Sequence, residues 1–166
     1  MSQVSEDPAV VLTRSEEETE DLGARLAAVL PAGTVLALSG PLGAGKTAFA
    51  RGVARGLGID PAEVSSPTFA WMVDYTDCRL PFVHADLYRL GDVPEHLAES
   101  ALESIGLAEA IDSDAVVLVE WWPWYRGREP RRLVRIEIAV ESGDGRSIHL
   151  IFRGSGLEEA RRSVQA

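Results

Sequence analysis

The segment Gly40-Pro-Leu-Gly-Ala-Gly-Lys-Thr47 constrains the fold of this chain more than any other, because it is a complete G-x-x-x-x-G-K-[ST] phosphate-binding loop. Residues 34–39 before it read as a short buried strand, and residues 47–55 after it read as a helix. A phosphate-binding loop joins a strand to a helix in this way. The sequence therefore predicts an α/β protein with a nucleotide phosphate site at the end of one strand.

Lys46 is the only lysine in the chain, and every other basic residue is arginine. An ammonium group is a compact, rotatable point charge, whereas a guanidinium group is a planar fork. We therefore interpret Lys46 as the group that bridges the terminal phosphates of a nucleotide, with the Thr47 hydroxyl as a ligand of Mg²⁺. The glycines let successive backbone N–H groups face an anion at a helix N-terminus. The residues expected to bind nucleotide here are Gly40, Leu42, Gly43, Ala44, Gly45, Lys46, Thr47 and Ala48.

Glu120 ends the apolar run Val116-Val-Leu-Val-Glu120, which reads as a second buried strand. In P-loop enzymes an acidic residue at the end of a neighbouring strand lies beside the Mg²⁺ ion. A strand followed by one acid is a weak motif alone, and a carboxylate facing solvent is the alternative. The phosphate-binding loop creates a demand for a metal-facing carboxylate, so we expect Glu120 to fill that position.

Length and composition predict one compact domain over residues 1–166, since 46% of the residues are hydrophobic and can bury a substantial core. Cys78 is the only cysteine, so no internal disulfide can form and a reducing cytoplasm is the expected compartment. Residues 1–7 lack the basic and apolar regions of a secretory leader. No apolar run approaches membrane-spanning length, so no membrane association is expected.

The net charge of −10 is unevenly distributed along the chain, with 7 basic and 20 acidic side chains up to residue 120 and 9 basic and 6 acidic after it. Extensive binding to a nucleic-acid backbone requires many cationic groups, so any involvement of RNA is expected to be indirect. Five arginines lie close together in the basic part. They either dock an acidic partner or form a solvated face, and we favour the solvated face; they are Arg126, Arg128, Arg131, Arg132 and Arg135.

The remaining elements alternate between strands and helices. The pattern predicts helices over residues 16–30, 94–106 and from 157 onward, and strands over 10–12, 69–75, 81–85, 133–140 and 147–152. Ser15 and Glu18 have the spacing of a capping box at the start of the first helix. The strands at 69–75 and 81–85 are expected to form one hairpin, and the last two strands another around Gly143-Asp-Gly145.

Two further segments, Val64-Ser-Ser-Pro-Thr-Phe69 and His84-Ala-Asp-Leu-Tyr-Arg-Leu90, lie between the phosphate-binding loop and Glu120-Trp121. With these four motifs in this order, the chain closely resembles the TsaE family, also called YjeE, over about residues 10–140. This family comprises bacterial P-loop ATPases required for threonylcarbamoyladenosine modification of tRNA. The chain departs from the usual family pattern at Pro41 and in having Trp122 and Trp124 after Trp121.

The resemblance implies that Lys46 and Thr47 hold ATP and Mg²⁺ and that Glu120 occupies the acidic position beside the metal. It also implies functional roles for Thr68 and Asp86. In the residues themselves, Thr68 lies in a segment able to sense a γ-phosphate, and Asp86 is able to orient water or the metal shell. The alternative for Thr68 is a hydroxyl at the start of a strand. The alternative for Asp86 is a turn or a salt bridge with Arg89.

Two residues next to these motifs have more open roles. Trp121 matches a family tryptophan expected near the nucleotide or at a partner surface. We interpret His84 as structural or partner-facing rather than as a metal ligand, since no cysteine or histidine cluster accompanies it.

The fold implied by the resemblance is a single three-layer P-loop NTPase domain around a central mixed β-sheet. The implied function is ATP hydrolysis that supports the TsaD and TsaB proteins, in which TsaD transfers the threonylcarbamoyl group to adenosine 37 of tRNA. Two alternatives remain open. One is a small-molecule P-loop kinase in which Asp86 deprotonates an acceptor hydroxyl, and the other is a nucleotide-dependent binding switch that hardly hydrolyses ATP.

Overall fold

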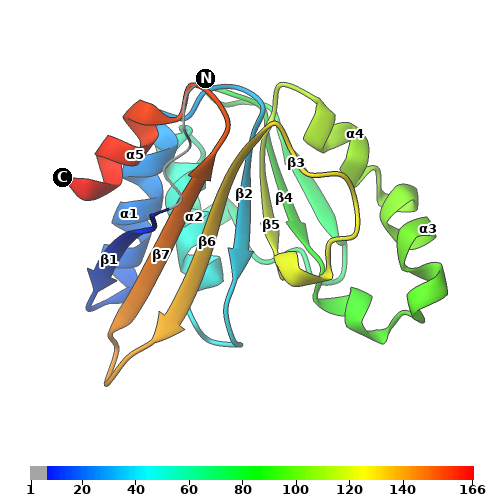
Figure 1. Ribbon diagram of the computed structural model, residues 1–166, viewed down its shortest axis with the longest axis horizontal. Helices are drawn as coiled ribbons and strands as arrows, with labels where there is room; N and C mark the ends of the chain where they lie inside the picture. Colours follow the sequence, from blue (N-terminus) through cyan, green and yellow to red (C-terminus); the bar gives the residue numbers. More distant parts are fainter. Residues whose placement is uncertain (1–6) are drawn as a thin grey trace.

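The computed structural model describes residues 7–166 of the chain (Figure 1). The expectation about a secretory leader therefore concerns residues that, apart from Asp7, lie outside the described part. The strands are β1 (Ala9–Thr13), β2 (Thr34–Ser39), β3 (Met72–Tyr75), β4 (Phe82–Asp86), β5 (Val116–Glu120), β6 (Arg132–Val140) and β7 (Arg146–Arg153). The helices are α1 (Glu16–Ala28), α2 (Lys46–Gly56), α3 (Glu95–Ile105), α4 (Leu107–Asp112) and α5 (Glu158–Gln165).

The seven strands form one mixed sheet in the order β1-β7-β6-β2-β5-β4-β3. The central strands β6, β2, β5 and β4 are parallel neighbours, whereas β1, β7 and β3 pair antiparallel at the two sides. Because β2, β4 and β5 point the same way, their carboxyl ends meet at one edge of the sheet. In an open α/β sheet this is the edge where ligands bind.

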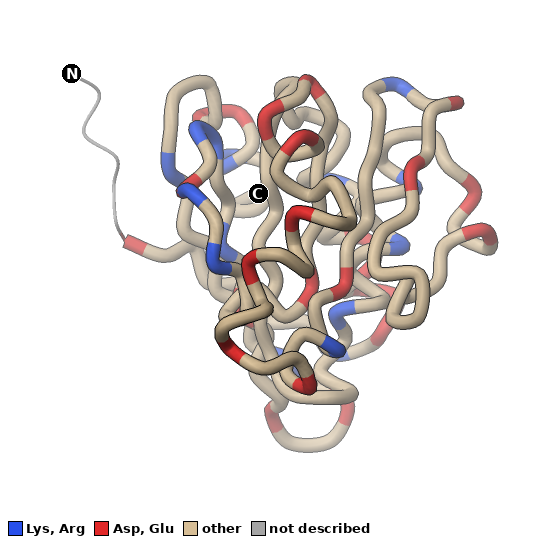
Figure 2. The backbone as a smooth tube through the Cα atoms, turned by 90° about the vertical axis from the view of Figure 1, so that its right-hand side faces the viewer, with Lys and Arg blue, Asp and Glu red and all other residues tan. Residues whose placement is uncertain are grey.

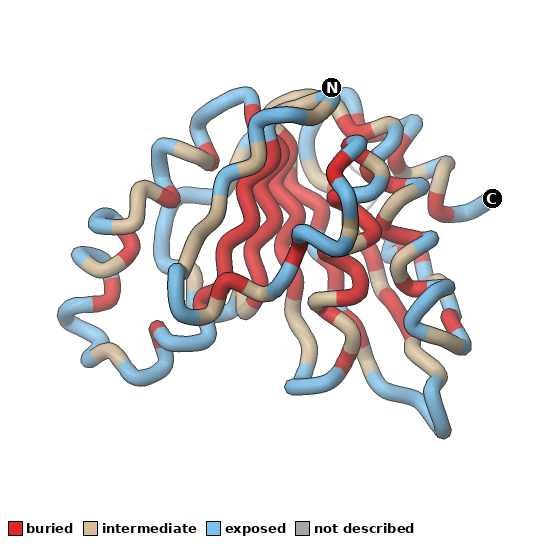
Figure 3. Tube along the Cα trace, turned by 180° about the vertical axis from the view of Figure 1, so that it is seen from behind, coloured by how far each residue is buried: buried red, intermediate tan, exposed pale blue. Residues whose placement is uncertain are grey.

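Helices lie on both sides of the β2, β5 and β4 part of the sheet, which gives three layers, and on one side of β1, β7 and β6 (Figure 1). One apolar core joins α1, α2 and α5 to the sheet, with Leu26, Phe49 and Val164 among its buried members. A second core joins α3 and α4 to the opposite face through residues such as Leu102 and Leu107. Strands β2, β4 and β5 are buried over most of their length (Figure 3), as expected for parallel strands covered on both faces, whereas β6 alternates between buried and exposed residues. The predicted fold class is confirmed.

Helices α1 and α2 pack closely because small residues lie between them. A Cβ atom built on Gly52 would lie 2.0 Å from the carbonyl oxygen of Glu20, so only glycine fits at this contact. Arg51 of α2 forms ion pairs with Glu16 and Glu20 of α1 at the end of the interface near the phosphate-binding loop. The Ser15 hydroxyl accepts from Glu18 N at 3.1 Å and caps α1. Helix α2, and with it the loop, is therefore fixed against α1.

Both hairpins are confirmed by the pairing of β3 with β4 and of β6 with β7, but one boundary was wrong. The strand expected from residue 69 begins only at Met72. Trp71 has a left-handed φ of 66°, and its N–H donates to the carbonyl oxygen of Pro67, so the chain turns here instead of extending. The side chain of Phe69 is consequently 88% exposed. Helix α4, which follows the left-handed Gly106, was not predicted.

The structure also bears on the expectations about Cys78, the clustered arginines and the membrane. Cys78 has a free thiol. Four of the five clustered arginines bond to carbonyls or carboxylates of the chain itself; they are Arg126, Arg128, Arg132 and Arg135. The preference for a solvated face over an acidic partner stays a prediction. Over residues 7–166 no helix has both the length and the apolar character needed to span a membrane.

Candidate active site

The phosphate-binding loop leaves β2 at Ser39 and enters α2 at Lys46. Gly43 and Gly45 have left-handed φ values of 75° and 107°, which other residues rarely adopt. Gly40 lies against β6, since a Cβ atom there would be 2.6 Å from the carbonyl oxygen of Ile138. The sequence of glycines thus lets the loop curl closely over the sheet edge and present the amino end of α2 to the space above.

The side chain of Lys46 folds back onto its own loop. Its Nζ donates to the carbonyl oxygens of Gly40 at 2.7 Å and Pro41 at 2.8 Å, and it lies 4.2 Å from the centroid of the Trp121 ring. The residue is buried, and this burial lowers the pKa of the ammonium group, with a partial opposing effect from the negative charges of Glu120 and Asp86. Lys46 is therefore a desolvated cation held by weak, neutral acceptors.

Asp86 and Glu120 lie side by side because β4 and β5 are parallel and pair these two residues in register. Both carboxylates are buried, with exposed fractions of 2% each. Asp86 Oδ1 accepts from the backbone N–H of Tyr88 at 2.9 Å, and no ion pair with Arg89 forms. The alternative of a salt bridge to Arg89 was wrong among the described residues, since Arg89 instead lies over the rings of Phe69 and Trp71.

The segment between α2 and β3 supplies hydroxyl groups to these carboxylates. Ser66 Oγ donates to Glu120 Oε2 at 2.9 Å and also contacts Asp86 Oδ2. Thr68 Oγ1 donates to Asp86 Oδ2 at 2.8 Å. Thr68 is thus not at the start of a strand, and its hydroxyl faces the site. The Ser66 hydroxyl has one proton but touches two carboxylates, so it cannot satisfy both at once.

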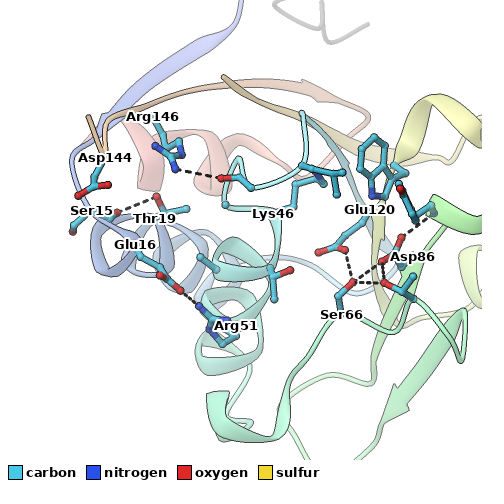
Figure 4. Close-up of a pocket in the computed structure, with 18 residues that line it drawn as sticks. Ser15, Glu16, Thr19, Lys46, Arg51, Ser66, Asp86, Glu120, Asp144 and Arg146 are labelled. Atoms are coloured by element: carbon cyan, nitrogen blue, oxygen red, sulfur yellow. Dashed lines mark hydrogen bonds and ion pairs between the residues drawn. The ribbon is translucent and has the colours of Figure 1, made fainter. Parts of the chain in front are cut away.

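These groups surround one cavity of about 670 Å³. Figure 4 shows Lys46, Glu120, Asp86 and Ser66 on one side of it and Ser15, Glu16, Thr19, Asp144 and Arg146 on the other. Ten of the predicted site residues line the cavity: Leu42, Gly43, Gly45, Lys46, Thr47, Ala48, Thr68, Asp86, Glu120 and Trp121. Gly40 and Ala44 do not line it, because Gly40 lies at the base of the loop and Ala44 is fully buried.

Several lining residues were not predicted. Arg146 donates from Nε to the carbonyl oxygen of Ala44 at 2.8 Å and from Nη2 to that of Gly43 at 3.3 Å, so it ties the hairpin of β6 and β7 to the loop. The parallel pairing of β6 with β2 brings this hairpin to the edge of the sheet where the loop lies. Arg146 could therefore be recognised as a lining residue only once the strand order was known. Ser66 and Tyr88 lie within motifs already recognised. The other unpredicted lining residues are Ser15, Glu16, Thr19, Arg51 and Asp144.

The donor atoms of the site suit a nucleotide with a hard cation. Within residues 7–166 no group of three or more His, Cys, Asp or Glu side chains is arranged to hold a metal. Thr47 and Glu120 both line the cavity, and Glu120 Oε2 lies on the cavity side beside the Ser66 hydroxyl. Mg²⁺ takes oxygen ligands, usually one or two from the protein together with substrate phosphates and water. The residues present fit that pattern.

His84 has no exposed surface, so its interpretation as a partner-facing residue was wrong. It lies in β4 beneath the site, between the rings of the core and Glu120. Trp122 stacks on Tyr125, with ring centroids 4.4 Å apart, and Trp124 is 39% exposed, so only Trp121 of this run lines the cavity.

The strand order, the glycine loop and the two carboxylates at neighbouring strand ends define a P-loop protein of the α/β class. A family model described as threonylcarbamoyl adenosine biosynthesis protein TsaE matches residues 13–148. The chain belongs to the TsaE family.

Relatives at the level of sequence and structure agree with this assignment. The chain is 38% identical over 146 residues to the tRNA threonylcarbamoyladenosine biosynthesis protein TsaE of Bacillus subtilis strain 168, covering 88% of this chain and 87% of the relative. It is 34% identical over 137 residues to the protein of the same name from Treponema pallidum strain Nichols, covering 82% and 96%. The crystal structure of Bacillus subtilis YdiB superposes with a TM-score of 0.75 at 31% identity, covering 96% of this chain and 95% of that one.

Proposed function

We propose that this protein is a Mg²⁺-dependent ATPase that supports a TsaD and TsaB complex in forming threonylcarbamoyladenosine at position 37 of tRNA in the cytoplasm. The observation that carries the proposal is the convergence of Lys46, Thr47, Asp86 and Glu120 on one cavity. Its relatives of the TsaE family bear the name of this biosynthetic pathway. The cavity of about 670 Å³ is in the range of small-molecule sites.

The loop and the start of α2 are the proposed phosphate site. Backbone N–H groups at the helix N-terminus attract anions, and the left-handed Gly43 and Gly45 allow the loop to wrap around them. Lys46 exchanges two neutral carbonyl acceptors for phosphate oxygens when nucleotide binds. A hydrogen bond with an ionised acceptor is about twice as strong as a neutral one, so this exchange favours binding.

Thr47 and Glu120 are the proposed protein ligands of Mg²⁺, which when bound neutralises charge that develops on the β- and γ-phosphates. Asp86 is proposed to orient the attacking water, and Thr68, which contacts Asp86, to sense the γ-phosphate. Trp121 is proposed to line the nucleotide site from the side of β5. Transfer to water needs positioning and charge stabilisation more than covalent chemistry, and these side chains supply both.

Protein partners, rather than RNA, are proposed to meet the site directly. Figure 2 shows acidic positions spread over the side of the molecule that bears α3 and α4, and the whole chain carries a net charge of −10. A surface of this charge repels a phosphate backbone. We therefore propose that tRNA is contacted through the partner proteins.

The test measures phosphate release and threonylcarbamoyladenosine formation with the TsaD and TsaB proteins of the same cell. We expect slow hydrolysis by the protein alone, faster hydrolysis with the partners, and multiple-turnover tRNA modification only when all three are present. Size-exclusion runs should show the three proteins eluting together when an ATP analogue is added. Phosphate transfer to a small-molecule acceptor would instead support the kinase alternative, and nucleotide-dependent assembly without hydrolysis would support the binding switch.

A further inference from the structure

His84 is a buried, polar side chain with no part in the proposed hydrolysis. It is fully buried in β4, and its imidazole stacks on Phe82 with ring centroids 6.2 Å apart. In the described part of the chain, only three buried side-chain polar atoms lack a hydrogen-bond partner: Nδ1 and Nε2 of His84, and Oε1 of Glu120. A buried polar group without a partner is costly and calls for an explanation.

Two of the three unpartnered atoms, one from each side chain, face each other. His84 Nε2 lies 3.6 Å from Glu120 Oε1. Side chains alternate along a strand, so His84 and Asp86 share a face of β4, and the register of β4 with β5 places Glu120 on that same face. The imidazole therefore lies one step deeper than the two carboxylates, directly behind Glu120.

The two oxygens of Glu120 face different surroundings. Oε2 accepts from Ser66 on the cavity side, whereas Oε1 turns inward to His84. The separation of Nε2 and Oε1 exceeds an N–H···O hydrogen bond by about half an ångström, so a small rotation of the carboxylate closes it. A ligand that draws Oε2 into the cavity would leave Oε1 as the atom through which the protein fixes the carboxylate.

The environment selects one tautomer of His84. With the proton on Nε2, the N–H points at Glu120 Oε1 and the unpartnered atom is only the lone pair of Nδ1. With the proton on Nδ1, a donor would be buried without an acceptor, and the lone pair of Nε2 would face a carboxylate oxygen. The proton on Nε2 leaves fewer polar atoms without a partner. The hydrogen bonds that the two ring nitrogens can make decide which of them carries the proton.

We propose that His84, with a proton on Nε2, is a positioning residue that donates to Glu120 Oε1 and holds Oε2 toward the metal–nucleotide complex. The inference rests on the proposed function, because His84 is assigned to position Glu120, the proposed metal ligand of that site. Carboxylates that bind metals are themselves commonly hydrogen-bonded, and loss of such an outer partner typically costs about 10- to 100-fold in metal affinity or activity.

Two substitutions separate positioning from simple packing. His84→Gln keeps an N–H donor close to the place of Nε2, whereas His84→Leu fills similar space without a donor. Phe82→Leu is the matched control, since Phe82 is buried on the same face of the same strand and packs against His84 but has no donor to offer Glu120. If His84 served only to fill the core, Leu would be tolerated better than Gln.

The readout is the Mg²⁺ concentration that half-saturates the rise in melting temperature with a non-hydrolysable ATP analogue. We expect His84→Leu to raise it about 10-fold or more, and His84→Gln and Phe82→Leu to leave it within about threefold of the wild-type value. If the wild-type protein responds to Mg²⁺ and the two His84 variants have the same half-saturating Mg²⁺ concentration as each other, the role of His84 is overturned. The proposed function would stand. Wild type with no nucleotide response would overturn the proposed function, and this inference with it.

A measurement on the wild-type protein does not depend on whether a variant folds. With ¹⁵N-labelled histidine, long-range ¹H–¹⁵N spectra assign the protonated nitrogen of His84, using His84→Gln to identify its signals. We expect the proton on Nε2, with the N–H proton moving downfield when Mg²⁺ and the analogue bind. A ring protonated at Nδ1 in that complex would contradict the proposal.

Discussion

The ammonium group of Lys46 lies 4.2 Å from the centroid of the Trp121 ring, on the face of the cavity where both carboxylates also lie. The same group donates to two loop carbonyls. Lys46 is thus held by a ring and by neutral oxygens, none of which carries a full negative charge. A bound nucleotide phosphate offers a stronger partner within the same cavity, so we expect Lys46 to exchange these contacts for phosphate oxygens when nucleotide binds.

Removal of the Lys46 charge should abolish most of the stabilisation by nucleotide. A ligand at about 100 times its dissociation constant adds roughly 2.7 kcal/mol to the stability of the folded state. We expect wild type to show this increase with ATP and Mg²⁺ in thermal unfolding, and Lys46→Ala to lose most of it. Lys46→Arg keeps the charge but replaces a point charge with a planar fork, so we expect weakened hydrolysis. Equal shifts in wild type and Lys46→Ala would argue against the phosphate site.

Neutral replacements of the carboxylates should separate binding from turnover. Glu120→Gln and Asp86→Asn retain the phosphate contacts but change the charge around the metal and the water. We expect nucleotide binding to persist and turnover with the partner complex to fall tenfold or more, which is about 1.4 kcal/mol in the barrier. Hydrolysis at the wild-type rate in both variants would show that these two side chains lack the assigned roles.

Loss of the Ser66 hydroxyl should destabilise the nucleotide-free protein. The Ser66 hydroxyl contacts both Glu120 Oε2 and Asp86 Oδ2, and a buried carboxylate oxygen left without its donor costs about 1–3 kcal/mol. We expect Ser66→Ala to lower the free energy of unfolding in urea by this amount and Mg²⁺ with nucleotide to restore part of it. Ser104→Ala is the control, because its exposed hydroxyl donates to Ala101 O within α3. A loss no larger than that of the control would contradict this role.

Nucleotide affinity should fall at alkaline pH because burial lowers the pKa of Lys46 in the free protein, whereas a bound phosphate favours its charged form. At pH values below the pKa of Lys46 in the free protein, Lys46 is protonated both with and without nucleotide. In that range Lys46 gives the affinity no dependence on pH. Above it binding must take up a proton, so affinity falls, by at most about tenfold per pH unit. Titration calorimetry between about pH 8 and 10 measures the nucleotide affinity and shows whether its decline begins below the usual pKa of a lysine. Lys46→Arg, which stays charged, should lack the decline.

Features set by local sequence could be predicted, whereas those set by the strand order could not. The loop between β2 and α2 follows from glycines and from apolar runs within one short segment, and Glu120 follows from its place at the end of a strand. Arg146 reaches the loop only because β6 lies beside β2, although about a hundred residues separate them in sequence. The folding of Lys46 onto Gly40 and Pro41 likewise depends on the three-dimensional path of the loop.

The turn at Trp71 shows why the segment before β3 was misjudged. Its apolar residues have the composition of a strand, but the left-handed Trp71 breaks the extension and releases residues 66–68 toward the carboxylates. A bulky residue at positive φ is uncommon and carries a strain that the surrounding contacts must offset. Propensity alone favours the strand, so the contacts of Ser66 and Thr68 were not visible in the sequence.

A crystal structure with a non-hydrolysable ATP analogue and Mg²⁺ would test the phosphate site and the metal ligands together. We predict phosphates against the loop from Gly43 to Thr47, with Lys46 Nζ moved from the carbonyls of Gly40 and Pro41 to phosphate oxygens. We also predict Mg²⁺ bound by Thr47 and Glu120, with Ser66 displaced from Glu120 Oε2. Nucleotide bound elsewhere, or bound at this loop with Lys46 still on its carbonyls and Glu120 away from the metal, would contradict the proposed site.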